Sequence, residues 1–259
     1  MATHHTPEGL QLRLRLPAGR CEITTADTAE TVVEAQPMNG SKASREAAES
    51  LVETLREHAG GGHELTVEVP KRKLLGLGNA QVRIRVRGPH GLDLDAATAS
   101  ADVVVTGRLR CADVRTASGD VSIEAADGAT EVKTASGDVE LGHMHDATDV
   151  KTMSGNVVVR ETGSATDVNT MSGDVRIRRA ASGAIQVRSM SGDVEAAIAP
   201  GATLFVDANS TSGDVRSELP VTGDAPSGPA DVDLRATSMS GDIVVTRAPE
   251  AARSVPAQG

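Results

Sequence analysis

The chain contains 259 residues, with 26 basic and 36 acidic side chains and a formal net charge of −10. This acidic balance argues against nucleic-acid binding, which depends on clustered lysine and arginine. The sequence also has no Trp, no Tyr and a single Phe, which disfavours stacking on bases and leaves Val, Ile, Leu, Ala and Thr to fill a narrow interior, as in a solenoid.

A secretory signal has a basic segment followed by an apolar run. The first residues, MATHHTPEGLQLRLRLP, do not show this pattern. No stretch of the sequence approaches the roughly 18 apolar residues that a membrane helix needs. The two cysteines, Cys21 and Cys111, are too few for a disulfide framework. We therefore expect a cytoplasmic protein that does not insert into a membrane.

Residues 9–94 are predicted to form strands and one helix behind a disordered tail at residues 1–8. Clean alternation of apolar and polar residues predicts three strands with polar outer faces. They are LQLRLRL (10–16), HELTVEV (63–69) and QVRIRVR (81–87). In AGRCEIT, Cys21 occupies a position that is valine in the later repeats.

Between the first two of these strands, the segment SREAAESLVETLREHAGGG (44–62) predicts an amphipathic helix, with Ser44 as its N-cap and Gly60 as its stop. Ala47, Leu51 and Leu55 fall on one face of this helix. Since a helix of about 15 residues is marginal in isolation, we expect its apolar face to pack on the neighbouring strands. Residues 9–94 would then cap a solenoid, whose open end otherwise invites edge-to-edge association.

Residues 95–247 are dominated by a repeat of the type Val-x-Thr-x-Ser-Gly-Asp-Val. Its glycines keep one constant spacing in the first four copies, and the spacing widens with each later copy: Gly119, Gly137, Gly155, Gly173, Gly192, Gly213 and Gly241. A fixed period of about 20 residues is typical of a solenoid in which each repeat forms one coil. The Pro/Gly-rich segment 221–231 predicts a loop, and the tail at residues 248–259 is expected to be disordered.

Columns of one residue type appear when the copies are aligned at this period. The aliphatic columns show the alternation of strands with one buried face. They are Val114, Val132, Val150 and Val168; Val103, Val121, Val139, Val157, Val175, Val194, Val215 and Ile243; and Val105, Ile123, Leu141, Val159, Ile177 and Val245. A threonine column should also point inward: Thr98, Thr116, Thr134, Thr152 and Thr170. Outward positions pair an acid with a base: Asp113 with Arg115, Glu131 with Lys133 and Asp149 with Lys151. We therefore predict a mostly β, single-chain parallel β-solenoid, right-handed, with about 18 residues per coil.

The Ser-Gly-Asp element lies between the two strand segments of each copy, where the chain must bend. Glycine adopts φ > 0 at low cost, and the adjacent Asp or Asn can hydrogen-bond the backbone of the turn. We interpret the seven repeat glycines as structural corner residues rather than as parts of a ligand site.

The tandem SGDV elements, each preceded by a Val-x-Thr strand, resemble the bacterial DUF4097 family, whose members are described as putative adhesins with β-strand repeats. The resemblance covers residues 8–247, from AGRCEI near the start through GLDLDAATASADVVV into the repeats. It implies a β-solenoid with an adhesin-like role, and it brings no catalytic residues to carry over to this chain.

Catalytic and cofactor motifs are absent from the sequence, so we expect neither enzyme activity nor a cofactor. His143 and His145 lie close together in sequence beside Asp146, but this group lacks a clear third ligand. The corner aspartates form a ladder with one carboxylate per coil, whereas calcium takes six or more oxygens: Asp120, Asp138, Asp174, Asp193, Asp214 and Asp242. We predict no metal site at either place. Cys111 shares a column of small residues with Ala129, Ala147 and Ala165 and is interpreted as a buried spacer.

These patterns predict a non-enzymatic scaffold, structural or protein-binding, that is a monomer or a weak homo-oligomer. Its partner is expected to be a protein of unknown identity. One alternative is a metal-dependent binding module or enzyme near the His143 turn or the aspartate ladder. Another is a cell-surface adhesin, because the family resemblance implies a surface location while the missing export signal favours the cytoplasm.

Overall fold

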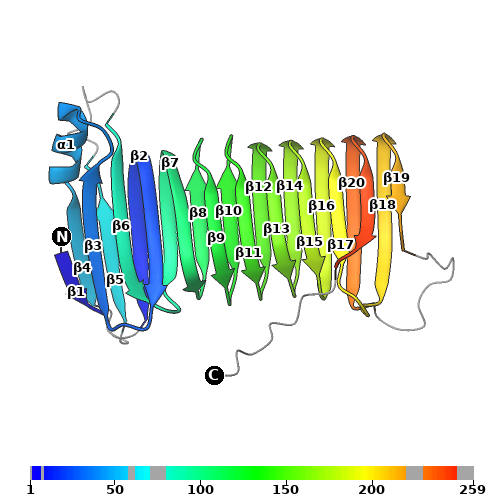
Figure 1. Ribbon diagram of the computed structural model, residues 1–259, viewed down its shortest axis with the longest axis horizontal. Helices are drawn as coiled ribbons and strands as arrows, with labels where there is room; N and C mark the ends of the chain where they lie inside the picture. Colours follow the sequence, from blue (N-terminus) through cyan, green and yellow to red (C-terminus); the bar gives the residue numbers. More distant parts are fainter. Residues whose placement is uncertain (1, 7–8, 58–61, 71–79, 220–229, 250–259) are drawn as a thin grey trace, which may run out of the picture.

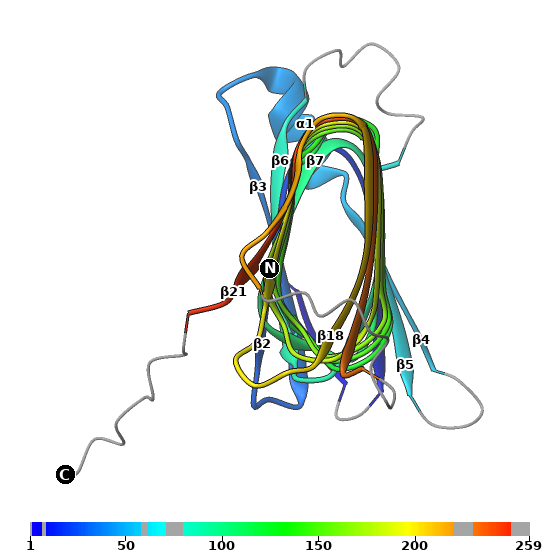
Figure 2. The same cartoon turned by 90° about the vertical axis from the view of Figure 1, so that its right-hand side faces the viewer.

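The computed structural model describes residues 2–6, 9–57, 62–70, 80–219 and 230–249. It confirms a mostly β solenoid, in which each coil contributes one strand to each of two opposite faces and the coils stack along the long axis (Figure 1). Viewed along that axis, the coils superimpose as a narrow oval (Figure 2). The right-handed winding stays a prediction.

The elements follow the chain from an irregular N-terminal part into regular coils. The N-terminal part contains β1 (Ala2–His5), β2 (Leu10–Ala26), β3 (Glu30–Pro37), α1 (Lys42–Glu49), β4 (Val52–Glu57), β5 (His63–Glu68) and β6 (Val82–Pro89). The coils contain β7 (Asp93–Leu109), β8 (Ala112–Thr116), β9 (Val121–Ala126), β10 (Thr130–Thr134), β11 (Val139–Met144), β12 (Thr148–Ser154), β13 (Val157–Thr162), β14 (Thr166–Ser172), β15 (Val175–Ala180), β16 (Gly183–Ser191), β17 (Val194–Ile198), β18 (Leu204–Ser212), β19 (Val215–Ser217), β20 (Val232–Ser240) and β21 (Ile243–Arg247).

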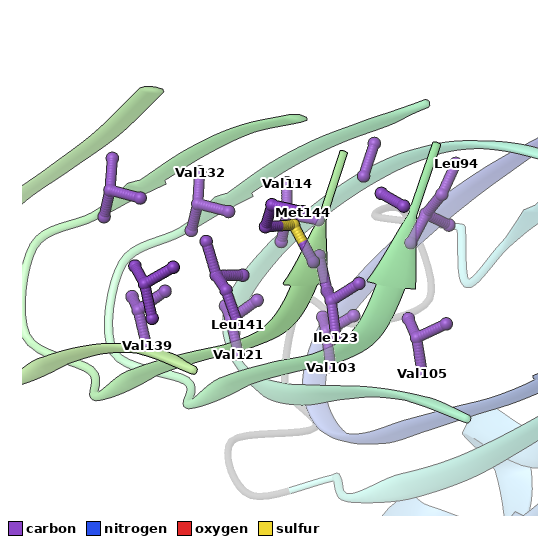
Figure 3. Close-up of a cluster of buried hydrophobic side chains, with 14 of the residues drawn as sticks. Leu94, Val103, Val105, Val114, Val121, Ile123, Val132, Val139, Leu141 and Met144 are labelled. Carbon is purple, nitrogen blue, oxygen red and sulfur yellow. The ribbon is translucent and has the colours of Figure 1, made fainter. Parts of the chain in front are cut away.

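The predicted columns are the rungs of the parallel sheets. Val132 of β10 lies between Val114 of β8 and Val150 of β12, in register and fully buried. Aliphatic side chains from the two faces meet in the narrow interior (Figure 3). Thr116, Thr134, Thr152 and Thr170 are buried as expected, while Thr98 is half-buried. Burying one valine stabilises a fold by about 1.5–3 kcal/mol, so the repeated columns supply the main stabilisation without aromatic residues.

The N-terminal end of the solenoid is closed by antiparallel strands. β5 and β6 run parallel to the two halves of β2, and β2 pairs in parallel with β7 along its length. Cys21 of β2 lies opposite Val103, which confirms its place in the valine column. Outside this coil, β4 pairs antiparallel with β5, β3 pairs antiparallel with β6, and β1 pairs antiparallel with β3. The helix α1 packs against β3 and β6.

Two expectations for this end are wrong. The helix is capped by Ser41, whose side chain accepts from the Ser44 backbone N–H, and it ends at Glu49 rather than near Gly60. Leu55 lies in strand β4, because pairing with β5 overrides the helix propensity of that segment. Residues 2–5, expected in a disordered tail, form β1 because β3 offers them a free edge.

The C-terminal coils are stacked out of chain order. β20 pairs in parallel with both β16 and β18, and β21 pairs with both β17 and β19. The last coil in sequence is therefore inserted between the two that precede it, and β18 and β19 form the end of the stack (Figure 1). Val215, expected in a buried column, is 46% exposed because its coil has a neighbour on one side only. The predicted loop at residues 221–231 and the tail at 248–259 lie largely outside the described residues.

Candidate binding groove and the corner ladder

The corner glycines allow successive coils to approach more closely than any side chain would permit. A Cβ atom at Gly137 would lie 2.1 Å from the carbonyl oxygen of Gly119, and one at Gly155 would lie 2.3 Å from that of Gly137. A positive φ accompanies this contact at Gly155, where it is 145°, but not at Gly137. The expected reason for glycine therefore holds at some corners only, and the close backbone approach is common to all of them. We propose that these glycines are structural.

The aspartate ladder at the corner is occupied by hydrogen bonds between coils. The backbone N–H of Asp138 donates to Asp120 Oδ1 at 3.0 Å, and that of Asn156 donates to Asp138 Oδ1 at 2.7 Å. The same bond recurs along the stack to Asp214, whose N–H donates to Asp242 Oδ1 at 2.9 Å. One oxygen of each such carboxylate is therefore engaged by the neighbouring coil, which favours a structural role over a calcium site.

The histidine turn does not gather a set of metal ligands in the described part of the chain. His143 Nδ1 lies 3.1 Å from Glu161 Oε2, and Asp146 Oδ1 accepts from the Ala147 backbone N–H at 2.8 Å. His145 is exposed. Within residues 2–6, 9–57, 62–70, 80–219 and 230–249, no three His, Cys, Asp or Glu side chains are grouped so that they could hold a metal ion.

A groove of about 740 Å³ crosses several coils on the outer face that begins with β8, β10, β12 and β14. Its floor is a row of small residues: Cys111, Ala129, Ala147 and Ala165 immediately precede these strands, and Ala184 is the second residue of β16. An acidic row slightly further along each strand forms one side of it: Asp113, Glu131, Asp149 and Asp167. Both rows run along the axis of the solenoid because equivalent residues of successive coils are in register. The groove is thus continuous across coils, as a site for an extended ligand must be.

The acidic row is balanced by bases on the same strands, as the sequence predicted. Asp113 pairs with Arg115 at 2.6 Å, Asp149 pairs with Lys151 at 2.7 Å, and Glu131 pairs with Lys133. Burial raises the pKa of Asp113, more than the nearby Arg115 lowers it. The hydrogen bond from Lys133 instead holds the pKa of Glu131 below its usual range. Because the charges are paired, the groove wall is polar and close to neutral.

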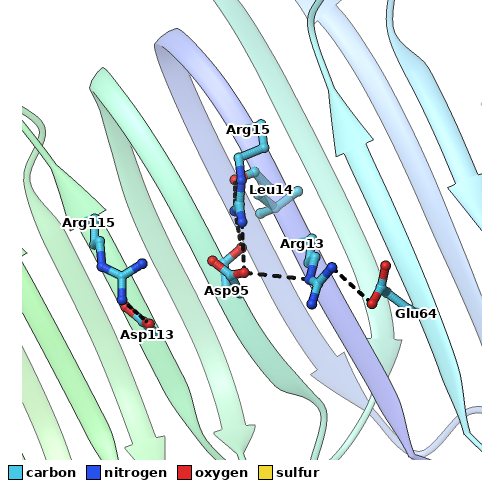
Figure 4. Close-up of polar contacts among 7 residues, drawn as sticks. All are labelled: Arg13, Leu14, Arg15, Glu64, Asp95, Asp113 and Arg115. Atoms are coloured by element: carbon cyan, nitrogen blue, oxygen red, sulfur yellow. Dashed lines mark hydrogen bonds and ion pairs between the residues drawn. The ribbon is translucent and has the colours of Figure 1, made fainter.

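An ion-pair network continues this wall toward the N-terminal cap (Figure 4). Arg15 Nη2 binds Asp95 Oδ2 at 2.7 Å, and Arg13 reaches both Asp95 at 3.6 Å and Glu64 Oε2 at 3.0 Å. Glu64 is buried, and its ion pair with Arg13 offsets the free energy lost when the carboxylate is removed from water. The network joins β5, β2 and β7 and fixes the first coils beside the groove.

The groove was not foreseen from the sequence, although its residues were aligned in the predicted columns. Cys111 is half-buried and contributes to the groove floor, so its interpretation as a buried spacer is wrong. The residue before each strand points outward, and a small residue there leaves a hollow beside the acidic row. A column of alanines directly preceding an outward acidic column is the signal that could have indicated it.

The chain matches the family described as Toastrack DUF4097 over residues 38–246. Its fold is similar to the crystal structure of a putative adhesin from Bacteroides fragilis NCTC 9343, with 12% sequence identity, a TM-score of 0.54 and coverage of 94% of this chain and 95% of that chain. A putative cell adhesion protein from Clostridium sporogenes ATCC 15579 aligns over 95% of this chain and 98% of that chain, at 11% identity and a TM-score of 0.33. No curated protein matches the chain.

At these identities the structural likeness shows the fold alone. Among the described residues, no helix is long and apolar enough to cross a membrane. The family match covers well over half of the sequence, and the parallel solenoid with its repeated Ser-Gly-Asp corners agrees with it. The chain therefore belongs to the DUF4097 family.

Proposed function

We propose that the chain is a non-enzymatic scaffold that binds an extended segment of a protein partner along the groove. The observation that carries this proposal is the continuity of the groove across several coils, from Cys111 to Ala184. A floor of small side chains admits a partner's backbone closely, and the carboxylate oxygens beside it can accept hydrogen bonds. The adhesin-like name of the structurally similar Bacteroides fragilis protein agrees with a binding role.

A protein ligand fits the groove better than a polysaccharide. Sugar-binding grooves usually offer aromatic faces, and this chain has no Trp, no Tyr and one Phe. The single Phe205 lies in β18, in the same outward row as Ala184 but two coils beyond it, and it does not line the groove. A partner segment with small side chains would contact the alanine floor without steric conflict.

The alternative of a metal-dependent module or enzyme has less support. His143 is already paired with Glu161, and the corner carboxylates accept backbone N–H groups from neighbouring coils. Location in the cytoplasm or at the cell surface, and the monomeric or weakly oligomeric state, stay predictions. Fractionation of the native cell and light scattering on the purified chain test them.

Filling the groove floor tests the proposal. The double variant Ala147→Leu with Ala165→Leu adds bulk to two exposed floor positions in adjacent coils. The control, Ser122→Leu with Val158→Leu, adds bulk to one outward row of the opposite face. Proteins retained from extracts of the native cell are compared for wild type and both variants. We expect a partner that the control retains and the groove variant loses. The same proteins on all three chains, or equal loss from both variants, would contradict the proposal.

A further inference from the structure

Four methionines form an exposed row on the same outer face as the groove. They lie near the ends of the strands, whereas the groove lies at the strand starts. Met153, Met171, Met190 and Met239 are 56%, 49%, 48% and 54% exposed. Each precedes the serine of a Ser-Gly corner. These serines pair directly, Ser154 with Ser172, Ser172 with Ser191 and Ser191 with Ser240, so the four methionines occupy neighbouring coils in that order.

An exposed column of apolar side chains is unusual in this chain. The other columns place aliphatic side chains inside, and Met144, at the end of β11, is buried in the core. The same row carries Ala117 and Ala135 in the earlier coils, so the corner accepts a small residue there. The corner geometry therefore does not require methionine, and four thioethers side by side call for another explanation.

The spacing of the row suits a thiophilic monovalent metal ion. Strands in a sheet lie about 4.7–4.9 Å apart, so sulfur atoms of equal side-chain conformation on adjacent rungs have the same separation. A metal–sulfur bond is about 2.3 Å long, which places two sulfurs on opposite sides of one ion about 4.6 Å apart. Thioether sulfur is a soft ligand that selects Cu(I) over hard cations. The rung spacing at each of the three intervals between the four methionines therefore matches the span of a linear S–metal–S bridge.

The surroundings also favour a cation on one side of the row. Past each serine and glycine comes a corner residue, and in three of the four coils it is a carboxylate: Asp174, Asp193 and Asp242. The charges of Asp193 and Asp242 attract a cation toward the corner, although one oxygen of each accepts a backbone N–H. Asp174 contributes less, because its second oxygen is paired with Arg176. On this basis we propose that Met153, Met171, Met190 and Met239 form a surface site for Cu(I), with ions bridged between thioethers of adjacent coils.

A site that bridges neighbouring thioethers requires two methionines on adjacent coils, whereas nonspecific binding to single sulfur atoms does not. Two double variants test this difference. The variant Met171→Leu with Met190→Leu leaves two thioethers that are not neighbours. The matched control, Met153→Leu with Met239→Leu, also leaves two thioethers, but on adjacent rungs. Both pairs keep an apolar side chain of similar size, so the fold is expected to persist, which circular dichroism checks. All proteins carry Cys111→Ser, because the half-buried thiol would compete for the metal.

The experiment titrates Ag(I), a redox-stable substitute for Cu(I), into protein labelled at the methionine methyl groups and follows the methyl NMR signals. The four row signals should shift while that of Met144 does not. Loss of even an outer-shell partner weakens metal affinity by about 10–100-fold, so the variant without adjacent thioethers should bind at least that much more weakly than its control. Anaerobic titration with Cu(I) should reproduce the order. Equal affinity of the two double variants, or shifts confined to signals outside the row, would overturn the proposal.

Discussion

Replacing Gly137 by valine should destabilise the solenoid by an amount that follows from the corner geometry. A Cβ atom there would lie 2.1 Å from the carbonyl oxygen of Gly119. An ordinary carbon–oxygen contact is about 3.3 Å, so the two coils must separate by about 1.2 Å at this corner. That movement breaks the bonds from Asp138 N–H to Asp120 Oδ1, at 3.0 Å, and from Val121 N–H to the Asp138 carbonyl, at 2.9 Å.

A neutral hydrogen bond contributes about 1 kcal/mol and one to a charged group about 1.5–3 kcal/mol, so the expected loss is about 2.5–4 kcal/mol before any strain from the valine methyls. In a chain of this size, 1 kcal/mol corresponds to about 2–4 °C in the unfolding midpoint. Calorimetry should therefore show a decrease of about 10 °C.

Two control variants isolate the cause. Gly163→Val introduces the same side chain at a glycine with no atom within 4 Å of the added Cβ and without a positive φ. Lys133→Ala removes an exposed cation paired with Glu131, a change usually worth less than about 0.5 kcal/mol. Both should leave the midpoint nearly unchanged. Equal midpoints for Gly137→Val and Gly163→Val would show that the close approach of the coils does not require glycine.

The remaining predictions concern metal, the cap and one carboxylate. Chelation should leave the thermal midpoint unchanged, since aliphatic columns stabilise the coils; a large decrease restored by calcium or zinc would revive the ladder or His143 site. Ala47→Asp should cost about 3 kcal/mol or more because Ala47 is 1% exposed, whereas Leu55→Asp, at a 36% exposed position of β4, should cost far less; similar hydrogen exchange in β3 and β6 for both variants would count against this. The pKa of Asp113 is raised chiefly by burial, so the folded state holds that proton more tightly and ionisation of Asp113 lowers stability as pH rises through the raised pKa. Asp113→Asn should therefore raise the midpoint near neutral pH, with the gain disappearing below the ordinary Asp pKa of 3.8; a gain that persists in acid would contradict this sign.

The regular coils could be predicted from the sequence because one residue type recurs at each position. Val114 and Val132 occupy the same position of successive repeats and pair directly. The repeat period in the sequence therefore also predicts the register of strand pairing. The acid–base pairs followed from the same alternation. The reason for glycine at the corners could not be predicted in this way. It is a contact between the backbones of two coils, whereas the sequence of one repeat suggests only a turn with φ > 0.

The ends of the solenoid could not be predicted because their order depends on contacts between distant segments. The longer interval before Gly241 indicates an insertion but does not say that β20 lies between β16 and β18. Leu51 to Glu57 fits a helical face as well as a strand, and the choice is made by pairing with β5. The groove and the methionine row are formed by outward-facing residues, and the alternation along a strand predicts only that such residues contact solvent.

Partner binding along the groove can be tested in the native cell with a photo-crosslinking amino acid at one position of each outer face. Ala147 lies on the groove floor, and Val158 lies outward on β13 of the opposite face. Binding along the groove should yield, on irradiation, a protein adduct from position 147 and none of that mass from position 158. The same adduct from both positions, or adducts from position 158 alone, would contradict binding along the groove.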